Sequence, residues 1–457
     1  LAQLKRPAGA RALSAQAHVV AEGTAVYAGT SGPFQLAFHR DGRFARTVDS
    51  EIGVDTGFDG RTGWRVDWSG MPQQIVLDEL LWERLMVAVP TGQWLSRGSP
   101  FTATLERESA DEAVYAVGAR GSDAFSAELV VDLAAGQPRR LIQRGGRGQE
   151  TVTFDDHAVF EGVWLPTRVT VSTGGVERAR YTVERVRLAG AADYAMPRQR
   201  PDDAAFDPDV PARVALGRAA TGHLLVKPRV NGVELGWFVF DSGAAVSIIS
   251  AEAAARLDLD QLGQLPLVSI LGTEAAPVYR VDALELGPLT VRRPLFLQMN
   301  LAPFSAAFGV EVHGIVGYDV LARSTAAVEV ARDALWLYPP GGYAPPGARW
   351  EALILDTQHP VVRASFPQAR DALFRLDLGS HLGLLFHTPW VERLGLLEGK
   401  NVEPVQITPN MRAAVLPVDW LELGGRRFEG VQGFHMLDDV PPLNDRATTG
   451  NIGLQLL

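Results

Sequence analysis

The chain has 457 residues, 46% of them hydrophobic and 21% charged, and a formal net charge of −10. These proportions are typical of globular domains, and the length is sufficient for about three of them. The negative net charge and the lack of a basic run disfavour nucleic acid as a partner. With no cysteine in the chain, disulfides, thiol catalysis and cysteine-bound metals are excluded. No run of about 18 apolar residues predicts a transmembrane segment.

Residues 1–196 predict a domain of antiparallel strands with one helix. Two apolar alternating runs, residues 34–38 and 43–47, flank His39-Arg40-Asp41-Gly42 and indicate a hairpin. Residues 74–89 have the apolar spacing of a helix. Further strands are expected at residues 128–132, 140–143 and 168–171.

An Asp-Thr-Gly triplet at Asp55-Thr56-Gly57 is predicted to be a turn without catalytic function. The residues before it, 49–53, are mostly polar and do not predict a buried strand. No apolar-apolar-Gly follows at the distance found in the repeat described below, and a bare three-residue match has low specificity.

Two proline-rich segments divide the rest of the chain. Residues 197–211 contain Pro201 and Pro208 among aspartates and predict a linker, and residues 339–347 predict a second one. The predicted domains that follow are therefore residues 212–338 and residues 348–457.

These two domains are copies of one unit. The segment Phe240-Asp241-Ser242-Gly243-Ala244 recurs more weakly as Leu376-Asp377-Leu378-Gly379-Ser380, with a shift of 136 in sequence position. Gly317 of an Ile-Val-Gly and Gly453 of an Asn-Ile-Gly are related by the same shift. A third pair, residues 281–287 and 418–424, matches with a shift of 137. Similarity that keeps its register over this length indicates a duplicated folding unit, and each copy predicts mostly antiparallel strands with one small helix.

The paired motifs resemble those of single-chain, two-lobed aspartic peptidases of the pepsin and retropepsin type. That family carries Asp-Thr/Ser-Gly-Ala/Ser in each lobe, with a later apolar-apolar-Gly packed behind the catalytic turn. The resemblance implies Asp241 and Asp377 as the catalytic pair, and a flap over residues 269–279 that covers an extended peptide. It also implies supporting roles for Ser242, Gly243, Gly379, Ser380, Gly317 and Gly453, and flap contacts with substrate from Ile270, Leu271, Gly272 and Thr273.

Two carboxylates within hydrogen-bond distance cannot both ionise at low cost, so they hold one proton between them. The ionised member takes a proton from a bound water while the protonated member donates to the scissile carbonyl. This chemistry predicts an aspartic endopeptidase that hydrolyses peptide bonds without a cofactor or metal. His381 and His387 follow the second motif, but their spacing suits no common metal site, so packed or solvated histidines are expected.

The second lobe departs from the family at Leu378. In the family, the hydroxyl after each Asp reaches the backbone of the opposite lobe and joins the two turns. Ser242 can do this and Leu378 cannot. Two interpretations follow: an active, asymmetric peptidase, or a catalytically inactive peptidase-like protein with an intact cleft.

The N-terminal domain resembles the β half-barrels of periplasmic lipoprotein carriers (LolA-like). The residues that carry this resemblance are the turns Gly57-Phe58-Asp59-Gly60 with Trp64, and Phe160-Glu161-Gly162-Val163-Trp164-Leu165-Pro166. A half-barrel can bind a lipid or lipopeptide, or it can serve as a scaffold or exosite. In the inactive alternative, lipid binding by this domain is the function.

The two resemblances together imply an exported bacterial protein, periplasmic or secreted, that acts as a monomer on a peptide or protein substrate. No signal peptide is present in the sequence, and a start at Leu1-Ala2-Gln3 leads us to expect a mature or trimmed form.

Overall fold

The structure, a computed structural model, describes residues 18–95, 98–145, 148–347, 350–399, 403–408 and 411–457. The chain forms two compact units, and the first comprises Leu1–Arg200 together with Gly263–Ala275. The second comprises Pro201–Leu262 and Ala276–Leu457 and contains both predicted peptidase lobes except residues 263–275. The predicted starts at residues 1 and 348 lie outside the described residues. In the described part of the chain, no helix has the length and apolar character needed to cross a membrane.

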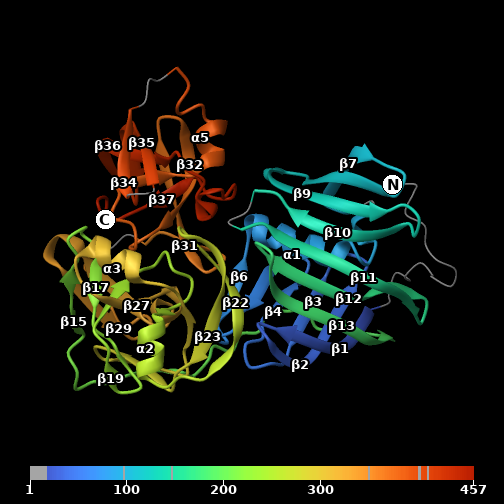
Figure 1. Cartoon of the computed structure of the whole chain (residues 1–457), viewed down its shortest axis with the longest axis horizontal. Helices are drawn as coiled ribbons and strands as arrows, with labels where there is room; N and C mark the ends of the chain where they lie inside the picture. Colours follow the sequence, from blue (N-terminus) through green and yellow to red (C-terminus); the bar gives the residue numbers. More distant parts are fainter. Residues whose placement is uncertain (1–17, 96–97, 146–147, 348–349, 400–402, 409–410) are drawn as a thin grey trace. The chain divides into compact units, whose positions relative to one another are not determined.

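A thirteen-stranded antiparallel sheet dominates the first unit (Figure 1). Each strand pairs with its sequence neighbour, except that β6 and β7 form opposite edges, and the first strand, β1, also pairs with the last, β13. Residues alternate between buried and exposed along β13, as in a sheet with one covered face. The strands are β1 (His18–Tyr27), β2 (Thr30–His39), β3 (Phe44–Val48), β4 (Asp55–Phe58), β5 (Gly63–Val66), β6 (Pro72–Ile75), β7 (Phe101–Glu108), β8 (Glu112–Ala119), β9 (Ser122–Asp132), β10 (Gln137–Gln143), β11 (Glu150–Phe160), β12 (Val163–Thr173) and β13 (Val176–Ala189).

The sheet and its helix confirm the fold class predicted for this domain. The expected hairpin is formed by β2 and β3, which pair antiparallel. The expected helix is α1 (Leu77–Ala88), and a short 3-10 helix follows at Gln93–Leu95. The helix begins later than its apolar spacing indicated because the preceding residues form β6.

Helix α1 contributes acidic side chains to a buried ionic network. Glu83 is 2% exposed, and its carboxylate accepts from Arg46 of β3 at 2.9 Å and from Arg65 of β5 at 3.3 Å. Burial pushes the pKa of Glu83 upward, but the two guanidinium groups outweigh this and hold it below its usual value. Glu79 pairs with Arg65, and Glu150 of β11 pairs with Arg178 of β13 at 3.1 Å. The covered face of the sheet is therefore partly ionic.

The triplet at Asp55 lies in β4, so the turn predicted there is wrong. The backbone pairs with β3 and β5, which makes this segment part of the meander. Asp55 Oδ1 accepts a hydrogen bond from the Val48 N–H at 2.9 Å, a purely local role.

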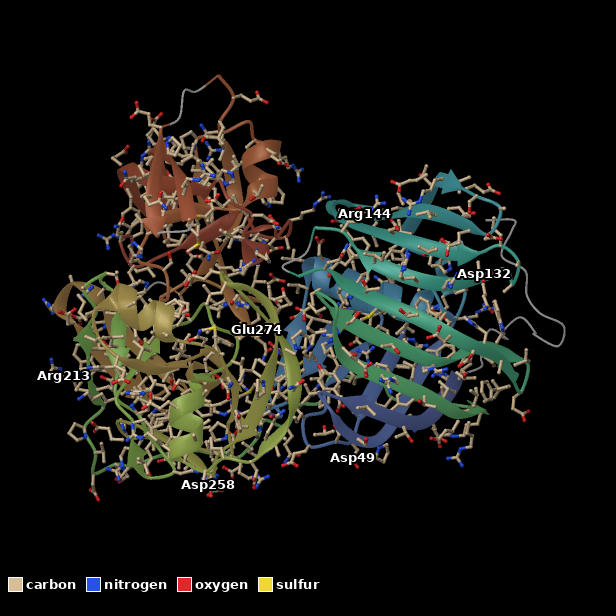
Figure 2. The ribbon with its side chains drawn as sticks, viewed as in Figure 1. Asp49, Asp132, Arg144, Arg213, Asp258 and Glu274 are labelled. Carbon is tan, nitrogen blue, oxygen red and sulfur yellow. The ribbon has the colours of Figure 1, made fainter. Side chains whose placement is uncertain are left out.

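On its exposed surface the same sheet carries ordinary surface ion pairs. Arg144, labelled in Figure 2, donates to Glu106 at 2.7 and 2.9 Å and to Glu128 at 2.8 Å. These pairs are open to solvent and contribute little to stability individually.

The predicted flap is a hairpin of β22 (Gln261–Ser269) and β23 (Gly272–Arg280). Its outer part, Gly263–Ala275, belongs to the first unit, and Gln264 donates its N–H to the carbonyl of Ala28 at 2.9 Å. A Cβ on Gly263 would lie 1.7 Å from the Ala28 oxygen, so this approach requires glycine. At the other end, residues 278–280 of β23 pair with β26 (Leu295–Gln298) of the first lobe.

The first lobe of the second unit is built from short strands. Its eight-stranded sheet has the order β16-β17-β20-β27-β21-β26-β23-β22, with β20 and β27 parallel. The remaining elements are β14 (Ala204–Phe206), β15 (Arg213–Ala215), β16 (Gly217–Arg218), β17 (Leu224–Val226), β18 (Arg229–Val230), β19 (Val233–Glu234), β20 (Trp237–Phe240), β21 (Ile248–Ile249), α2 (Ala251–Arg256), β24 (Ala283–Leu286), β25 (Leu289–Arg292), β26 (Leu295–Gln298), α3 (Ala302–Phe308), β27 (Val312–Val316), α4 (Tyr318–Leu321), β28 (Thr325–Glu329), a 3-10 helix (Val330–Arg332) and β29 (Ala334–Tyr338).

Part of the predicted linker 197–211 is regular structure. Ala204–Phe206 forms β14, which pairs antiparallel with β25. Asp203 also accepts from the buried Arg323 at 2.9 Å, which fixes this segment to the first lobe. Proline content alone does not reveal such pairing, because proline is tolerated next to edge strands.

The second lobe repeats the central arrangement of the first. Parallel pairs β20–β27 and β32–β37 correspond, as do the antiparallel pairs β21–β27 and β33–β37. Its elements are β30 (Ile354–Asp356), β31 (His359–Phe366), β32 (Ala369–Leu376), β33 (Leu384–Phe386), α5 (Thr388–Arg393), β34 (Pro404–Thr408), β35 (Met411–Leu423), β36 (Arg426–Met436), a 3-10 helix (Pro441–Leu443) and β37 (Gly450–Ile452).

Candidate active site

The two Asp-x-Gly turns occupy equivalent places in the two lobes. Asp241 follows β20 and Asp377 follows β32, each at the end of a strand that pairs in parallel with the strand preceding the later glycine. The Asp241 N–H donates to the carbonyl of Val316 at 3.0 Å, and the Asp377 N–H donates to that of Ile452 at 2.9 Å. The two acceptors are equivalent positions of the repeat, as the two aspartates are.

The later glycines pack directly behind the turns. A Cβ on Gly317 would lie 2.7–2.9 Å from backbone atoms of Val246 and Ala244, and one on Gly453 would lie 2.5 Å from the Ser380 carbonyl oxygen. Real Cβ contacts are longer than this, so only glycine fits at either position. The supporting role that the sequence predicts for both glycines stays a prediction, and the structure places each of them against the turn of its own lobe.

Each catalytic candidate lies against the glycine of the opposite turn. A Cβ on Gly243 would lie 2.4 Å from Asp377 Oδ1, and a Cβ on Gly379 would lie 2.3 Å from Asp241 Oδ2. The structure thus brings together the two aspartates and the two glycines named from the sequence. Both aspartates keep partial solvent access, which a water shared between them requires.

Ser242 joins the two turns. Its hydroxyl donates to the Leu376 carbonyl at 2.7 Å and accepts from the Leu378 N–H at 3.1 Å. Leu378 cannot return these bonds and instead packs against the apolar core of the first lobe, together with Leu454. The two turns are therefore joined by hydrogen bonds at Ser242 and by apolar packing at Leu378.

The pKa values of the two carboxyls are shifted by different neighbouring groups. Burial, and after it the charge of Asp377, raises the pKa of Asp241 above its usual 3.8. Burial also raises the pKa of Asp377, but a hydrogen bond from Asn451 and the charge of Arg375 oppose that rise. The pair titrates as one coupled system, so its two titration steps belong to both carboxyls together.

Asn451 is a site residue that sequence reasoning missed. Its amide Nδ2 donates to Asp377 Oδ2 at 2.6 Å. The signal was present in the repeat, since Asn451 is the counterpart of Ile315 and is the polar member of an otherwise apolar motif.

The histidines near the second motif differ in their surroundings. His387 is fully buried and hydrogen-bonded. His381 is half-buried, and its ring lies 5.2 Å from the ring of His223. Burial lowers the pKa of His223 to about 4, and its Nδ1 lies 2.7 Å from Thr221 Oγ1.

The flap residues named from the sequence lie at the tip of the β22–β23 hairpin. Ile270 and Leu271 form its turn and are 43% and 52% exposed, respectively. Gly272 has a φ of 122°, which favours glycine. Thr273 packs against Gly174 of the first unit, where a Cβ would lie 2.5 Å from its methyl group. Glu274, labelled in Figure 2, follows on β23.

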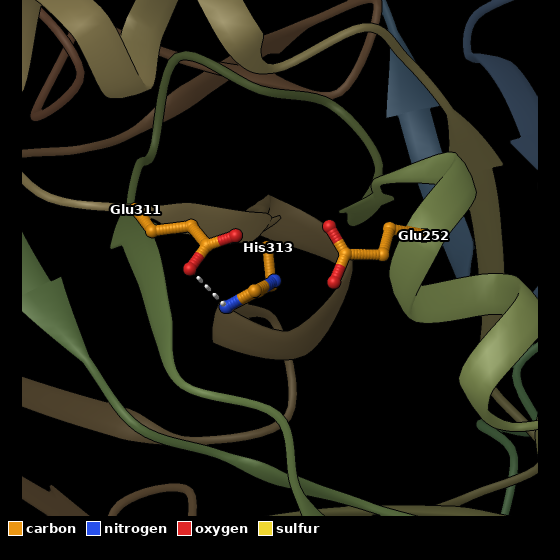
Figure 3. A group of neighbouring side chains, drawn as sticks. All are labelled: Glu252, Glu311 and His313. Atoms are coloured by element: carbon orange, nitrogen blue, oxygen red, sulfur yellow. Dashed lines mark ion pairs between the residues drawn. The ribbon is translucent and has the colours of Figure 1, made fainter.

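One group of potential metal ligands lies elsewhere in the first lobe (Figure 3). Glu252, Glu311 and His313 each place one ligand atom within 4.8 Å of the others, and His313 Nε2 is 3.9 Å from Glu311 Oε2. Ligand atoms on a zinc ion lie roughly 3.3–3.6 Å apart, given metal–ligand bonds of about 2.0–2.2 Å. Because both glutamates are exposed and the spacing is wide, we interpret the group as a surface ion-pair cluster.

Comparison with known proteins supports the first lobe. Residues 226–320 match the family model of aspartyl proteases, a segment that includes Asp241 and Gly317. The aspartyl protease resemblance stated from the sequence is thereby confirmed. Among curated proteins, none matches the chain.

Solved structures similar to this chain include the following three. A retropepsin-like aspartic protease from Rickettsia conorii is 19% identical, covers 29% of this chain and 95% of its own, and has a TM-score of 0.23. A LolA superfamily protein from Nitrosomonas europaea is 17% identical, covers 39% and 88%, and has a TM-score of 0.27. A putative outer membrane lipoprotein-sorting protein domain from Vibrio parahaemolyticus is 10% identical, covers 38% and 87%, and has a TM-score of 0.25.

Proposed function

We propose that the chain is an aspartic endopeptidase in which Asp241 and Asp377 activate a water that attacks a peptide bond. The observation that carries this proposal is the reciprocal packing of each carboxyl against the glycine of the opposite turn. That arrangement is the one a shared proton and a shared water need. The family match of residues 226–320 supports the same chemistry.

The raised pKa of Asp241 suits the acid of this pair. A carboxyl that keeps its proton can donate to the scissile carbonyl while the ionised partner takes a proton from the water. The tetrahedral intermediate then collapses as the amine leaves with a proton from the dyad. No covalent enzyme intermediate is formed, so the chain needs no activated nucleophile.

The Leu378 departure is compatible with turnover. The backbone N–H of Leu378 keeps its hydrogen bond to Ser242, so the substitution leaves this donor satisfied. The missing hydroxyl is replaced by packing of Leu378 on the core of the first lobe. Apolar burial of this kind contributes roughly 1.5–3 kcal/mol for a whole leucine side chain, comparable to the hydrogen bonds it replaces.

The alternative is an inactive protein whose half-barrel carries a lipid or lipopeptide. The ionic network against α1 favours the peptidase interpretation, because an acyl chain in that region would displace paired charges such as Arg46–Glu83. We propose that the first unit is a scaffold that also holds the flap tip, as the Gln264–Ala28 hydrogen bond indicates.

We also propose that the protein acts in the periplasm or is secreted, as a monomer. The half-barrel motifs recognised in the sequence support export. Fractionation of a bacterium that expresses the full gene tests this, and recovery of the protein in the cytoplasm would overturn it.

Cleavage of an unfolded protein across acid to neutral pH tests the activity. We expect cleavage by the native chain, inhibition by pepstatin, and complete loss in Asp241→Asn and Asp377→Asn. Asp258→Asn is the matched control, since Asp258 is exposed and lies outside the site (Figure 2). Cleavage that survives Asp241→Asn would rule out the dyad, and lipid co-purifying with a protein that cleaves nothing would favour the carrier.

A further inference from the structure

The lobes differ at one position of the strand behind each turn. Ile315 in the first lobe and Asn451 in the second occupy equivalent places on β27 and β37, opposite Ile248 and Leu385 of the neighbouring strands, respectively. Asn451 is only 8% exposed. A buried amide in place of an isoleucine is costly unless both of its ends are hydrogen-bonded.

Both ends of the Asn451 amide are hydrogen-bonded. Nδ2 lies 2.6 Å from Asp377 Oδ2, and Oδ1 lies 3.0 Å from Nε2 of His387. The amide nitrogen can only donate and the amide oxygen can only accept. In this orientation the carboxylate of Asp377 is the acceptor and His387 is the donor.

The other side of His387 fixes its ring. Nδ1 lies 2.9 Å from the carbonyl oxygen of Thr448, which can only accept. The Thr448 hydroxyl, 3.2 Å from Nδ1, donates its own proton to Asp445 Oδ2 at 2.7 Å. In this amide orientation both nitrogens of the fully buried ring face acceptors, and the orientation therefore requires a ring with two N–H groups and a positive charge.

The reverse orientation of the amide corresponds to a second protonation state of Asp377 and His387. If Asp377 holds the proton, it donates to the Asn451 oxygen, and the Asn451 nitrogen donates to a neutral His387. Asp377 and His387 together hold the same number of protons in the two orientations, because the proton that Asp377 gains is the one that His387 loses, and Asp241 keeps its own proton in both. The Asn451 amide thus links the charge of Asp377 to the charge of His387.

We propose that Asn451, held by His387, is a positioning residue that keeps Asp377 ionised and leaves the shared proton on Asp241. This assignment rests on the proposed peptidase function, and it makes Asp377 the base and Asp241 the acid. In the first lobe the equivalent Ile315 offers Asp241 no comparable donor.

Among the charged groups around Asp377, a guanidinium also favours its ionised form. Arg375, two positions before it, is buried and lowers the pKa of Asp377 through its charge. The guanidinium is itself paired with Asp445 and lies 4.0 Å from Asp356. Asp241, which also faces Asp377, is the protonated partner in this assignment. His435 of β36 is another buried histidine of this lobe, and burial lowers its pKa.

The pH dependence of peptide cleavage by Asn451→Leu tests the role. Leucine keeps the shape but removes the donor, so the carboxylate loses a charge-assisted hydrogen bond. The acidic limb of the kcat/KM profile is expected to move up by about one to two pH units, with kcat reduced and KM little changed. Thr449→Val is the matched control, because Thr449 is also fully buried and its Oγ1 has no hydrogen-bond partner among the described residues, and it should leave the limb in place.

His387→Phe provides a second variant should Asn451→Leu fail to fold. The acidic limb of its kcat/KM profile should also move to higher pH. An acidic limb that stays where it is in a folded Asn451→Leu or His387→Phe protein would overturn the assignment.

Carboxyl ¹³C NMR titration of aspartate-labelled protein gives a readout without turnover. Asp377→Asn and Asp241→Asn assign the two signals. We expect the lower of the two titration steps to belong to Asp377 and to rise in Asn451→Leu. If the native protein cleaves nothing but shows this order, the proposed function fails and the role of Asn451 stands; the opposite order would overturn the role of Asn451 even in an active enzyme.

Discussion

Ser242→Ala should weaken the connection between the lobes more than a single hydroxyl deletion normally would. Ser242 is 6% exposed, and its hydroxyl bonds both the Leu376 carbonyl and the Leu378 N–H. Each bond contributes about 0.5–1.5 kcal/mol, so we expect unfolding free energy to fall by about 1–3 kcal/mol. The second lobe cannot compensate because Leu378 has no hydroxyl.

Denaturant unfolding followed by tryptophan fluorescence measures this loss, and Ser242→Thr is the control because it keeps the hydroxyl. The same change should lower kcat, since a displacement of reacting groups by about 1 Å costs roughly a hundredfold. KM should change less, because Ser242 acts on the turns rather than on the substrate. A Ser242→Ala protein with native unfolding midpoint and native kcat would refute the proposed role of this hydroxyl.

Three further outcomes follow from the geometry. Because folding raises the pKa of Asp241, the native state binds more protons than the unfolded state between pH 3.8 and the raised pKa. The free energy of unfolding therefore falls as the pH rises through that range. Asp241→Asn should reduce this fall, which denaturant unfolding at a series of pH values measures. Glu83→Leu should cost the first unit about 3–5 kcal/mol in thermal unfolding, because Arg46 is left buried without its carboxylate. Gly263→Val should increase hydrogen exchange in the flap tip, because its side chain would collide with the Ala28 carbonyl.

Most of the fold could be predicted from the sequence because a duplication shows one pattern twice. The apolar strands before Asp241 and Asp377, and the later glycines at equal spacing in the two copies, follow directly from the repeat. Residues 34–38 and 43–47 predict a hairpin because apolar alternation and a turn signal coincide there. The contacts behind these features are local in the sequence or occur in both copies of the repeat.

The features that could not be predicted depend on tertiary partners. The strand β14 lies in a proline-rich segment, and its strand character comes from pairing with β25, which is distant in the sequence. The sequence predicts a turn at the Asp55 triplet because its neighbours are polar, and the pairing with β3 and β5 that makes it a strand is not visible in the local sequence. The membership of the flap tip in the first unit involves a backbone contact with Ala28, which no periodicity records.

The two lobes differ because each contributes a different polar group to the site. The first lobe supplies the hydroxyl that joins the turns, through Ser242, and the second supplies the amide that fixes the charge, through Asn451. A symmetric dyad has two equal places for its proton, and half of its population has acid and base exchanged. An amide on one side removes that degeneracy, so every molecule presents the same acid and the same base to a bound peptide. The departures at Leu378 and Asn451 are then two parts of one arrangement. The second lobe lacks the hydroxyl that joins the turns, and its Asn451 amide determines which carboxyl holds the shared proton.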